Sequence, residues 1–199
     1  AGGACGGGGM GGQESAAKIA FGYIPIQNGF GSYVFLLDMR AYEGTSRNYR
    51  DATSQLTENG VQYSIENLGD IEAERPWVEA AEGPGIGESF VIEGCGSGNM
   101  HLLIMNGFLS AAKPYLYFQN GRVKTIKVEG LTSGIAGVCE VLDTPHPQTV
   151  DVSFIQMDEP LRITILDVYP GTKYQDTCLH YLITWDGEVI PFEDSANQN

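Results

Sequence analysis

The chain has 199 residues, enough for one domain with a substantial core, and its 25 Asp and Glu against 11 Lys and Arg give a formal net charge of −14. This excess of acid repels phosphate backbones and anionic membrane surfaces, which argues against nucleic acid as a partner. No apolar run approaches the roughly 18 residues that are needed to cross a bilayer, so we expect no membrane insertion.

The N-terminal part predicts an extension in front of a main domain. Residues 1–17 are rich in glycine and predict a flexible tail. The sequence begins at Ala1 rather than at a methionine and shows no basic, apolar leader there, which would fit a mature secreted form. Two strands at 18–26 and 32–42, around the turn QNGFG, predict a β-hairpin within an extension that spans residues 18–49. The polar stretch 43–60 marks the boundary with a main domain at 50–192, and residues 193–199 form a C-terminal tail.

The main domain consists of short β-rich runs separated by turn signals, and no segment has a sustained helical period. The expected strands are residues 61–65, 88–93, 100–108, 115–118, 123–128, 138–142, 149–156, 161–169 and 179–185. The pairs Asn120-Gly121 and Asp186-Gly187 predict tight hairpins with type I′ turns. Alternation in LRITILDV is typical of a strand with one buried and one solvated face. Together these features predict an all-β, antiparallel jelly-roll sandwich.

The four cysteines indicate whether the protein works in an oxidising or a reducing compartment. Cys5, Cys95, Cys139 and Cys178 include no CxxC pair, which argues against a zinc knuckle or a thioredoxin motif. Their even number favours one or two disulfides in an oxidising compartment, with free buried thiols as the alternative. We therefore expect a secreted, cell-surface or periplasmic protein.

Six segments occur in an order and spacing typical of one family. They are ATSQL (52–56), PWVEAAEGPGIGE (76–88), IMNG (104–107), NGRVKTIKV (120–128), LDTPHPQTV (142–150) and RITILDVYPGTKYQDTC (162–178). On these segments the chain resembles the NADase-type glycan-binding domain, a discoidin-like module of bacterial extracellular proteins, over about residues 50–185. The resemblance implies a galactose-binding-like jelly-roll β-sandwich that binds a ligand, with glycans suspected. The glycohydrolase activity in the family name belongs to a separate catalytic domain of some members.

The chain departs from the family pattern in two places. Members commonly have an Asp-Gly pair where this chain reads Asn67-Leu68-Gly69-Asp70. They commonly have a Ser-Glu pair after the last cysteine, where this chain has His180 and Tyr181. Both departures fall near loops, so the ligand of the family does not follow from the resemblance.

The loops supply candidate ligand-binding residues. A sugar site needs an aromatic face for the C–H surface of the ring and a few fixed polar groups for its hydroxyls. The loops at 65–79 and 169–177 and the turn at 106–108 offer these types at one end of the expected sandwich. The candidates are Asn67, Asp70, Trp77, Glu79, Asn106, Tyr169, Lys173, Tyr174 and Asp176.

Structural interpretations compete with these assignments. Pro170 and Gly171 fit the centre of a type II turn, in which the glycine supplies a positive φ. Asp176 can bond backbone amides in an Asx turn or pair with Lys173, and Trp77 can pack in the core or at its rim. The sequence leaves open whether the 169–177 loop is a corner or a binding site.

The sequence offers no catalytic arrangement. His101, His146 and His180 are isolated from other catalytic residue types, and the patterns GxSxG and HExxH are absent. We therefore expect no enzymatic activity and no cofactor. The alternating acids Asp70, Glu72 and Glu74 keep a Ca²⁺ site as the alternative, although the EF-hand pattern is absent.

Two functions fit these observations. The first is a non-catalytic extracellular or periplasmic module that recognises a glycan or glycoprotein through its loops. The second is a structural subunit or homo-oligomer in an extracellular or periplasmic assembly, such as a filament sheath or a surface layer. In such an assembly the apolar strand SYVFLLDM could add to a neighbour's sheet.

Overall fold

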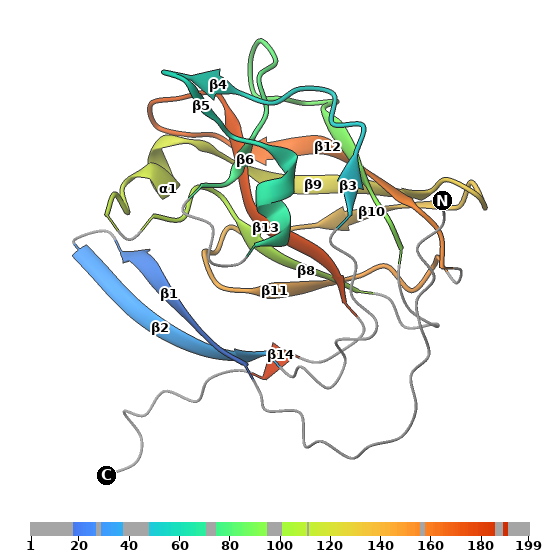
Figure 1. The fold of residues 1–199 in the computed structure, drawn as a ribbon, viewed down its shortest axis with the longest axis horizontal. Coiled ribbons are helices and arrows are strands. Elements are labelled where there is room, and N and C mark those ends of the chain that lie inside the picture. Colours follow the sequence, from blue (N-terminus) through green and yellow to red (C-terminus); the bar gives the residue numbers. More distant parts are fainter. Residues whose placement is uncertain are drawn as a thin grey trace.

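The computed structural model describes residues 18–26, 29–37, 48–70, 75–94, 101–110, 112–155, 158–185 and 189–190. Almost all of the regular structure in these residues is strand (Figure 1). The strands are β1 Lys18–Ile26, β2 Gly29–Leu37, β3 Tyr49–Arg50, β4 Thr57–Glu58, β5 Val61–Gln62, β6 Trp77–Val78, β7 Ser89–Ile92, β8 His101–Asn106, β9 Gly121–Gly130, β10 Ala136–Glu140, β11 Gln148–Asp151, β12 Leu161–Tyr169, β13 Thr177–Trp185 and β14 Val189–Ile190. The helical elements are the 3₁₀ helix η2 at Ile65–Gly69 and the short helix α1 at Leu116–Gln119.

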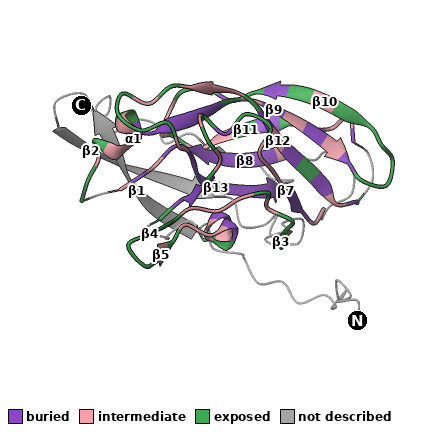
Figure 2. Ribbon diagram, turned by 90° about the horizontal axis from the view of Figure 1, so that it is seen from above, coloured by how far each residue is buried: buried purple, intermediate pink, exposed green. Residues whose placement is uncertain are grey.

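The main sheet folds over into a sandwich. Its strand order is β11-β8-β13-β9-β12-β7-β3, with β10 beside β9 and β6 beside β13. One layer holds β11, β8, β13 and β6, and the other holds β10, β9, β12, β7 and β3 (Figures 1 and 2). The predicted all-β sandwich is therefore confirmed.

The two layers meet where β13 runs beside the start of β9. There Thr177 pairs with Gly121 in the parallel sense, whereas the other described pairs in this sheet are antiparallel. The amide of Gly121 donates to the carbonyl of Asp176 at 2.9 Å, which fixes the junction. The prediction of a purely antiparallel sandwich is wrong at this pair, because the loop before β13 docks directly beside the start of β9.

The core lies between the two layers. On β12, Leu161, Ile163 and Ile165 are buried while Arg162 and Leu166 are exposed, as the alternation predicts. The same cluster takes up side chains from the other long strands and from η2, namely Ile65, Leu68, Trp77, Phe90, Ile92, Leu102, Ile104, Ile126, Val128, Leu179 and Leu182. Figure 2 shows this buried layer running through β8, β9, β12 and β13.

The segment before β9 corrects the expected strand at 115–118 and the hairpin at Asn120-Gly121. Residues Leu116–Gln119 form α1, and Asn120 has φ −97° and ψ 162°, which no type I′ turn contains. Gly121 is needed for close packing instead, since a Cβ there would lie 2.7 Å from Oγ1 of Thr177. The second predicted hairpin, at Asp186-Gly187, lies outside the described residues.

The N-terminal hairpin is present with shifted bounds. β1 pairs antiparallel with β2 from Lys18 opposite Leu37 to Ile26 opposite Gly29, and β14 adds to β2 at Leu36 and Leu37. Both termini (1–17 and 191–199) and the segment 38–47 lie outside the described residues, so the predicted domain limits there stay predictions.

The described cysteines correct part of the disulfide expectation. Cys139 and Cys178 are both free and buried, and burial raises the pKa of each thiol above its ordinary value. Cys5 and Cys95 lie outside the described residues. A separate finding concerns membranes: no helix in the described part of the chain is long and apolar enough to span one.

Candidate functional site

The loop between β12 and β13 docks on the end of α1. The amide and the hydroxyl of Thr172 donate to the carbonyl of Phe118 at 3.0 and 3.1 Å. The amides of Lys173 and Tyr174 donate to the carbonyl of Gln119 at 3.1 and 2.8 Å. These bonds satisfy carbonyls that the end of a helix leaves without intrahelical donors. The loop is therefore a fixed corner.

Gly171 is required at this corner for lack of space. A Cβ at this position would lie 2.4 Å from the carbonyl oxygen of Gln119 and 2.5 Å from that of Tyr174. Its φ is not in the positive range, so the type II turn predicted for Pro170 and Gly171 is wrong. The glycine allows the loop and α1 to approach each other.

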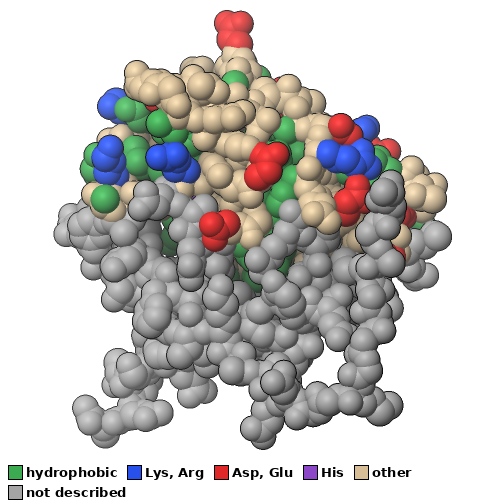
Figure 3. Space-filling model, viewed as in Figure 1, with side chains coloured by type: hydrophobic (Ala, Val, Ile, Leu, Met, Phe, Trp, Pro, Cys, Tyr) green, Lys and Arg blue, Asp and Glu red, His purple; other side chains and the backbone are tan. Residues whose placement is uncertain are grey.

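The corner carries an exposed group of side chains, which we name the aromatic–lysine patch: Tyr115, Phe118, Lys173 and Tyr174. The three aromatic side chains are 52%, 37% and 38% exposed, respectively. Nζ of Lys173 lies 4.7 Å from the centroid of the Tyr174 ring. A hydrogen bond with Tyr174 and the charge interactions with Tyr174 and Tyr115 raise the pKa of Lys173 above its ordinary value, so the amine stays protonated at neutral pH. Figure 3 shows basic side chains beside hydrophobic ones at the left-hand end, where Figure 1 places α1.

The sequence identified half of this patch. Lys173 and Tyr174 were candidates, whereas Tyr115 and Phe118 were missed because YLYF was assigned to a strand. Pro114 is the available signal, because proline favours the start of a helix.

An ion pair between the buried Arg122 and the exposed Asp143 lies against α1. Nε and Nη2 of Arg122 donate to the two carboxylate oxygens of Asp143 at 2.7 and 3.0 Å, and Nη1 donates to the carbonyls of Tyr117 and Asn120. The hydroxyl of Tyr117 donates to the same carboxylate at 2.9 Å. Burial raises the pKa of Asp143, but the hydrogen bonds from Arg122 and Tyr117 outweigh it, and the pKa lies below its ordinary value. This network holds the patch in place.

Trp77 is a core residue, so its assignment as a ligand contact is wrong. Its side chain is fully buried, and its ring packs edge-on against Phe90 with 5.3 Å between centroids. Its indole N–H donates to the carbonyl of Ser54 at 3.2 Å. A ligand could not reach the ring without opening the sandwich.

Glu79 and Asn106 are also buried, and both serve the backbone rather than a ligand. The carboxylate of Glu79 accepts from the amides of Thr177 and Ala81 at 2.8 and 2.7 Å, and burial raises its pKa. The amide group of Asn106 bonds both the N–H and the C=O of Val123, at 3.0 and 2.7 Å. Their assignment as ligand contacts is wrong because these bonds occupy their polar atoms away from solvent.

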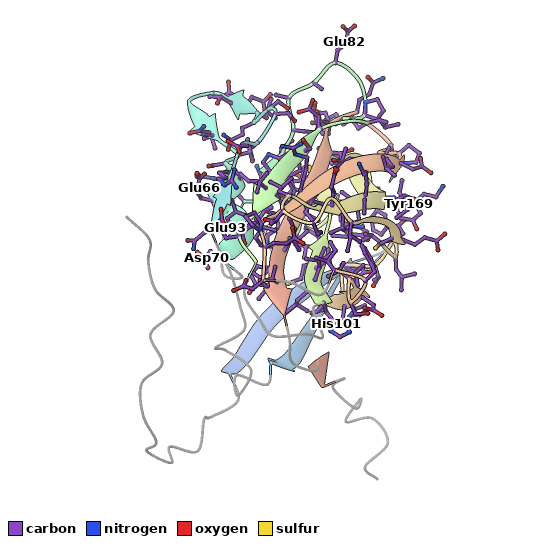
Figure 4. The ribbon with its side chains drawn as sticks, turned by 90° about the vertical axis from the view of Figure 1, so that its right-hand side faces the viewer. Glu66, Asp70, Glu82, Glu93, His101 and Tyr169 are labelled. Carbon is purple, nitrogen blue, oxygen red and sulfur yellow. The ribbon has the colours of Figure 1, made fainter. Side chains whose placement is uncertain are left out.

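The other candidates lie away from the patch or face other partners. Asn67 donates to the carbonyl of Pro76 at 3.1 Å, and Tyr169 donates from its hydroxyl to the carbonyl of Val141 at 3.1 Å. Asp70 is exposed after η2, and Figure 4 shows it on the opposite side of the described part from Tyr169. Asp176 is half-buried, and burial raises its pKa. Among the described side chains no ion pair joins it to Lys173.

The calcium hypothesis rests on residues that are only partly described. Asp70 lies within the described residues, whereas Glu72 and Glu74 do not. The described residues contain no group of three or more His, Cys, Asp or Glu side chains that could hold a metal ion. The Ca²⁺ site therefore stays a prediction.

Comparison with known proteins identifies the family. The family model for the NAD glycohydrolase translocation F5/8 type C domain matches residues 41–183, which cover the sandwich, α1 and the β12–β13 loop. No individual curated protein matches the chain. F5/8 type C domains are discoidin-like β-sandwiches, in agreement with the two layers described above. The chain therefore belongs to the NAD glycohydrolase translocation F5/8 type C domain family.

Proposed function

We propose that the chain is a non-catalytic binding module that recognises a glycan through the aromatic–lysine patch. The observation that carries the proposal is the exposure of Tyr115, Phe118 and Tyr174 beside a protonated amine on a fixed corner. A domain of the F5/8 type C family fits a non-catalytic binding or translocation module, which supports the broader part of the proposal. The glycan is the narrower part of the proposal.

The chemistry of the patch suits a sugar. An exposed aromatic ring stacks on the C–H face of a pyranose, and tyrosine hydroxyls and the lysine amine bond its hydroxyl or carboxylate oxygens. Because four backbone-directed hydrogen bonds already fix the loop on α1, binding costs little further ordering. A small exposed patch of this kind gives weak binding, with a Kd between about 1 μM and 1 mM.

Removing one ring of the patch should weaken glycan binding. For the tightest ligand on a glycan array, Tyr174→Ala should raise the Kd at least about tenfold, which equals about 1.4 kcal/mol. Isothermal titration calorimetry on the full chain gives the value. Leu166→Ala is the matched control, because Leu166 is also 38% exposed but lies on β12, outside the patch. Unchanged affinity in both Tyr174→Ala and Tyr115→Ala would refute this site.

We propose further that the module acts without a cofactor and outside the cytoplasm, as a secreted, cell-surface or periplasmic protein. The occurrence of the family in secreted bacterial proteins supports the location. The burial of His180 in β13 supports the non-catalytic role, because the imidazole lies out of reach of a substrate at the surface.

A second candidate function is a structural subunit of a filament sheath or surface layer. The observation that favours it is the edge of β2, since β14 pairs only with Leu36 and Leu37 and the described residues give the remainder of that edge no partner. A free strand edge accepts a strand from another molecule. Native mass spectrometry of the full chain over a wide concentration range should then show a ladder of oligomers. A monomer at every concentration would contradict self-assembly.

A further inference from the structure

The β8–β13 pair is apolar on both faces. Leu103 lies opposite Ile183, and Met105 lies opposite Tyr181. These four side chains, which we name the outer apolar face, are at most 4% exposed. They alternate along their strands with residues of the core, namely Leu102, Ile104 and Leu182. Because successive side chains of a strand point to opposite faces, the outer apolar face points away from the core.

Some part of the chain must cover the outer apolar face, because its side chains are buried. This cover does not reach the edge strand β11. Thr149 on β11 is the cross-strand neighbour of Leu103 and therefore shares its face of the sheet. Thr149 is exposed, whereas Leu103 is fully buried. The cover therefore extends over β8 and β13 and stops before β11.

Chain connectivity limits what can form this cover. β13 ends at Trp185 and β14 begins at Val189. The four Cα–Cα steps between them span at most about 15 Å, and packed sheets lie about 10 Å apart. Because β14 pairs with Leu36 and Leu37 of β2, this end of the β1-β2-β14 sheet is held close to the end of β13. Figures 1 and 4 place that sheet on the β8, β11 and β13 side of the sandwich.

The sequence of the β1-β2 hairpin also suits a strand pair that covers the outer apolar face. The strands read KIAFGYIPI and GFGSYVFLL, and Lys18 is their only charged residue. Such composition is typical of strands that bury apolar surface, and it does not suit a solvated edge. The hairpin and β14 both lie outside the family match at 41–183.

We propose that the outer apolar face is a docking surface and that its occupant is the chain's own β1-β2-β14 sheet. The sheet forms a third layer, built from both ends of the chain, which this protein adds to the family's sandwich. With this sheet in place, the chain itself covers an apolar surface that other proteins could bind if the sandwich stood alone. The aromatic–lysine patch lies on different elements, α1 and the β12–β13 loop, so this proposal stands apart from glycan binding.

Hydrogen exchange of the full chain, read by mass spectrometry, tests the proposal with a matched pair of variants. Leu103→Asp puts a carboxylate under the cover, and Thr149→Asp puts the same group on the neighbouring strand where the face is exposed. In Leu103→Asp the amides of 18–37 and 189–190 should exchange at least about tenfold faster, while those of β12 keep their wild-type rates. Thr149→Asp should change neither set.

Unchanged exchange at 18–37 in a folded Leu103→Asp variant would overturn the proposal. If that variant does not fold, Leu103→Ala takes its place, and its cavity should speed exchange about threefold in the same residues. Unchanged exchange rates at residues 18–37 in Leu103→Ala would also overturn the proposal. Protection of 18–37 that rises with protein concentration would mean that a second copy supplies the cover, which also overturns the proposal.

Discussion

Replacing Trp77 with alanine should lower the free energy of unfolding by about 3–5 kcal/mol. The ring is fully buried against Phe90, so its removal leaves a cavity and also leaves the carbonyl of Ser54 without its donor. Domains of this size are stable by only about 5–15 kcal/mol, so the variant should be close to unfolding. Urea denaturation followed by far-UV circular dichroism gives the difference.

The control for this prediction is Tyr174→Ala. Tyr174 is exposed in the aromatic–lysine patch, so the change should alter the free energy of unfolding by less than about 0.5 kcal/mol. A Trp77→Ala variant as stable as the wild type would contradict the core assignment. It would restore Trp77 as a ligand-binding candidate.

Stability should also fall as the pH drops from about 6.5 to about 4, because of His180. Burial lowers the pKa of His180 to about 4, with a small opposing effect from the charge of Asp70. An unfolded histidine has a pKa near 6.5, so below that pH the unfolded state gains a proton that the folded state does not accept. Between the two pKa values the folded state loses up to about 3 kcal/mol relative to the unfolded state, and below the lower one this loss is complete.

His180→Gln isolates this contribution from the carboxyl groups that titrate at lower pH. The free energy of unfolding of the wild type should fall by about 2–3 kcal/mol more than that of the variant between pH 7 and pH 4. His146→Gln, at an exposed position, should follow the wild type. Parallel curves for wild type and His180→Gln would show that the histidine is not buried in its neutral form.

The sheet elements could be predicted because strand faces repeat every two residues. The alternation in LRITILDV places Leu161, Ile163 and Ile165 inside and Arg162 outside, as observed. The four-residue helix α1 could not be found in this way, since one turn is too short for a helical period. Its position decides the site, because the loop that carries Lys173 and Tyr174 is fixed on its last carbonyls.

The candidate site was predicted less well, for a physical reason. Asn, Glu and Trp in loops suit a sugar, but the same groups also satisfy backbone amides and fill cores, and a sequence does not show which role applies. In the structure Asn106 and Glu79 take the backbone role, since their side chains accept hydrogen bonds from the amides of Val123 and Thr177. The sequence correctly singled out Gly171, but it gave a positive φ as the reason. The glycine is needed because a Cβ there would clash with the carbonyl oxygen of Gln119.

A hydrogen-exchange footprint with the best ligand from a glycan array tests the central claim most directly. The full chain is compared with and without a saturating concentration of that glycan. We expect slower exchange confined to residues 114–120 and 170–176, which carry α1 and the docked loop. Protection at η2 or elsewhere on the sandwich, or no glycan that binds at millimolar concentration, would contradict the account.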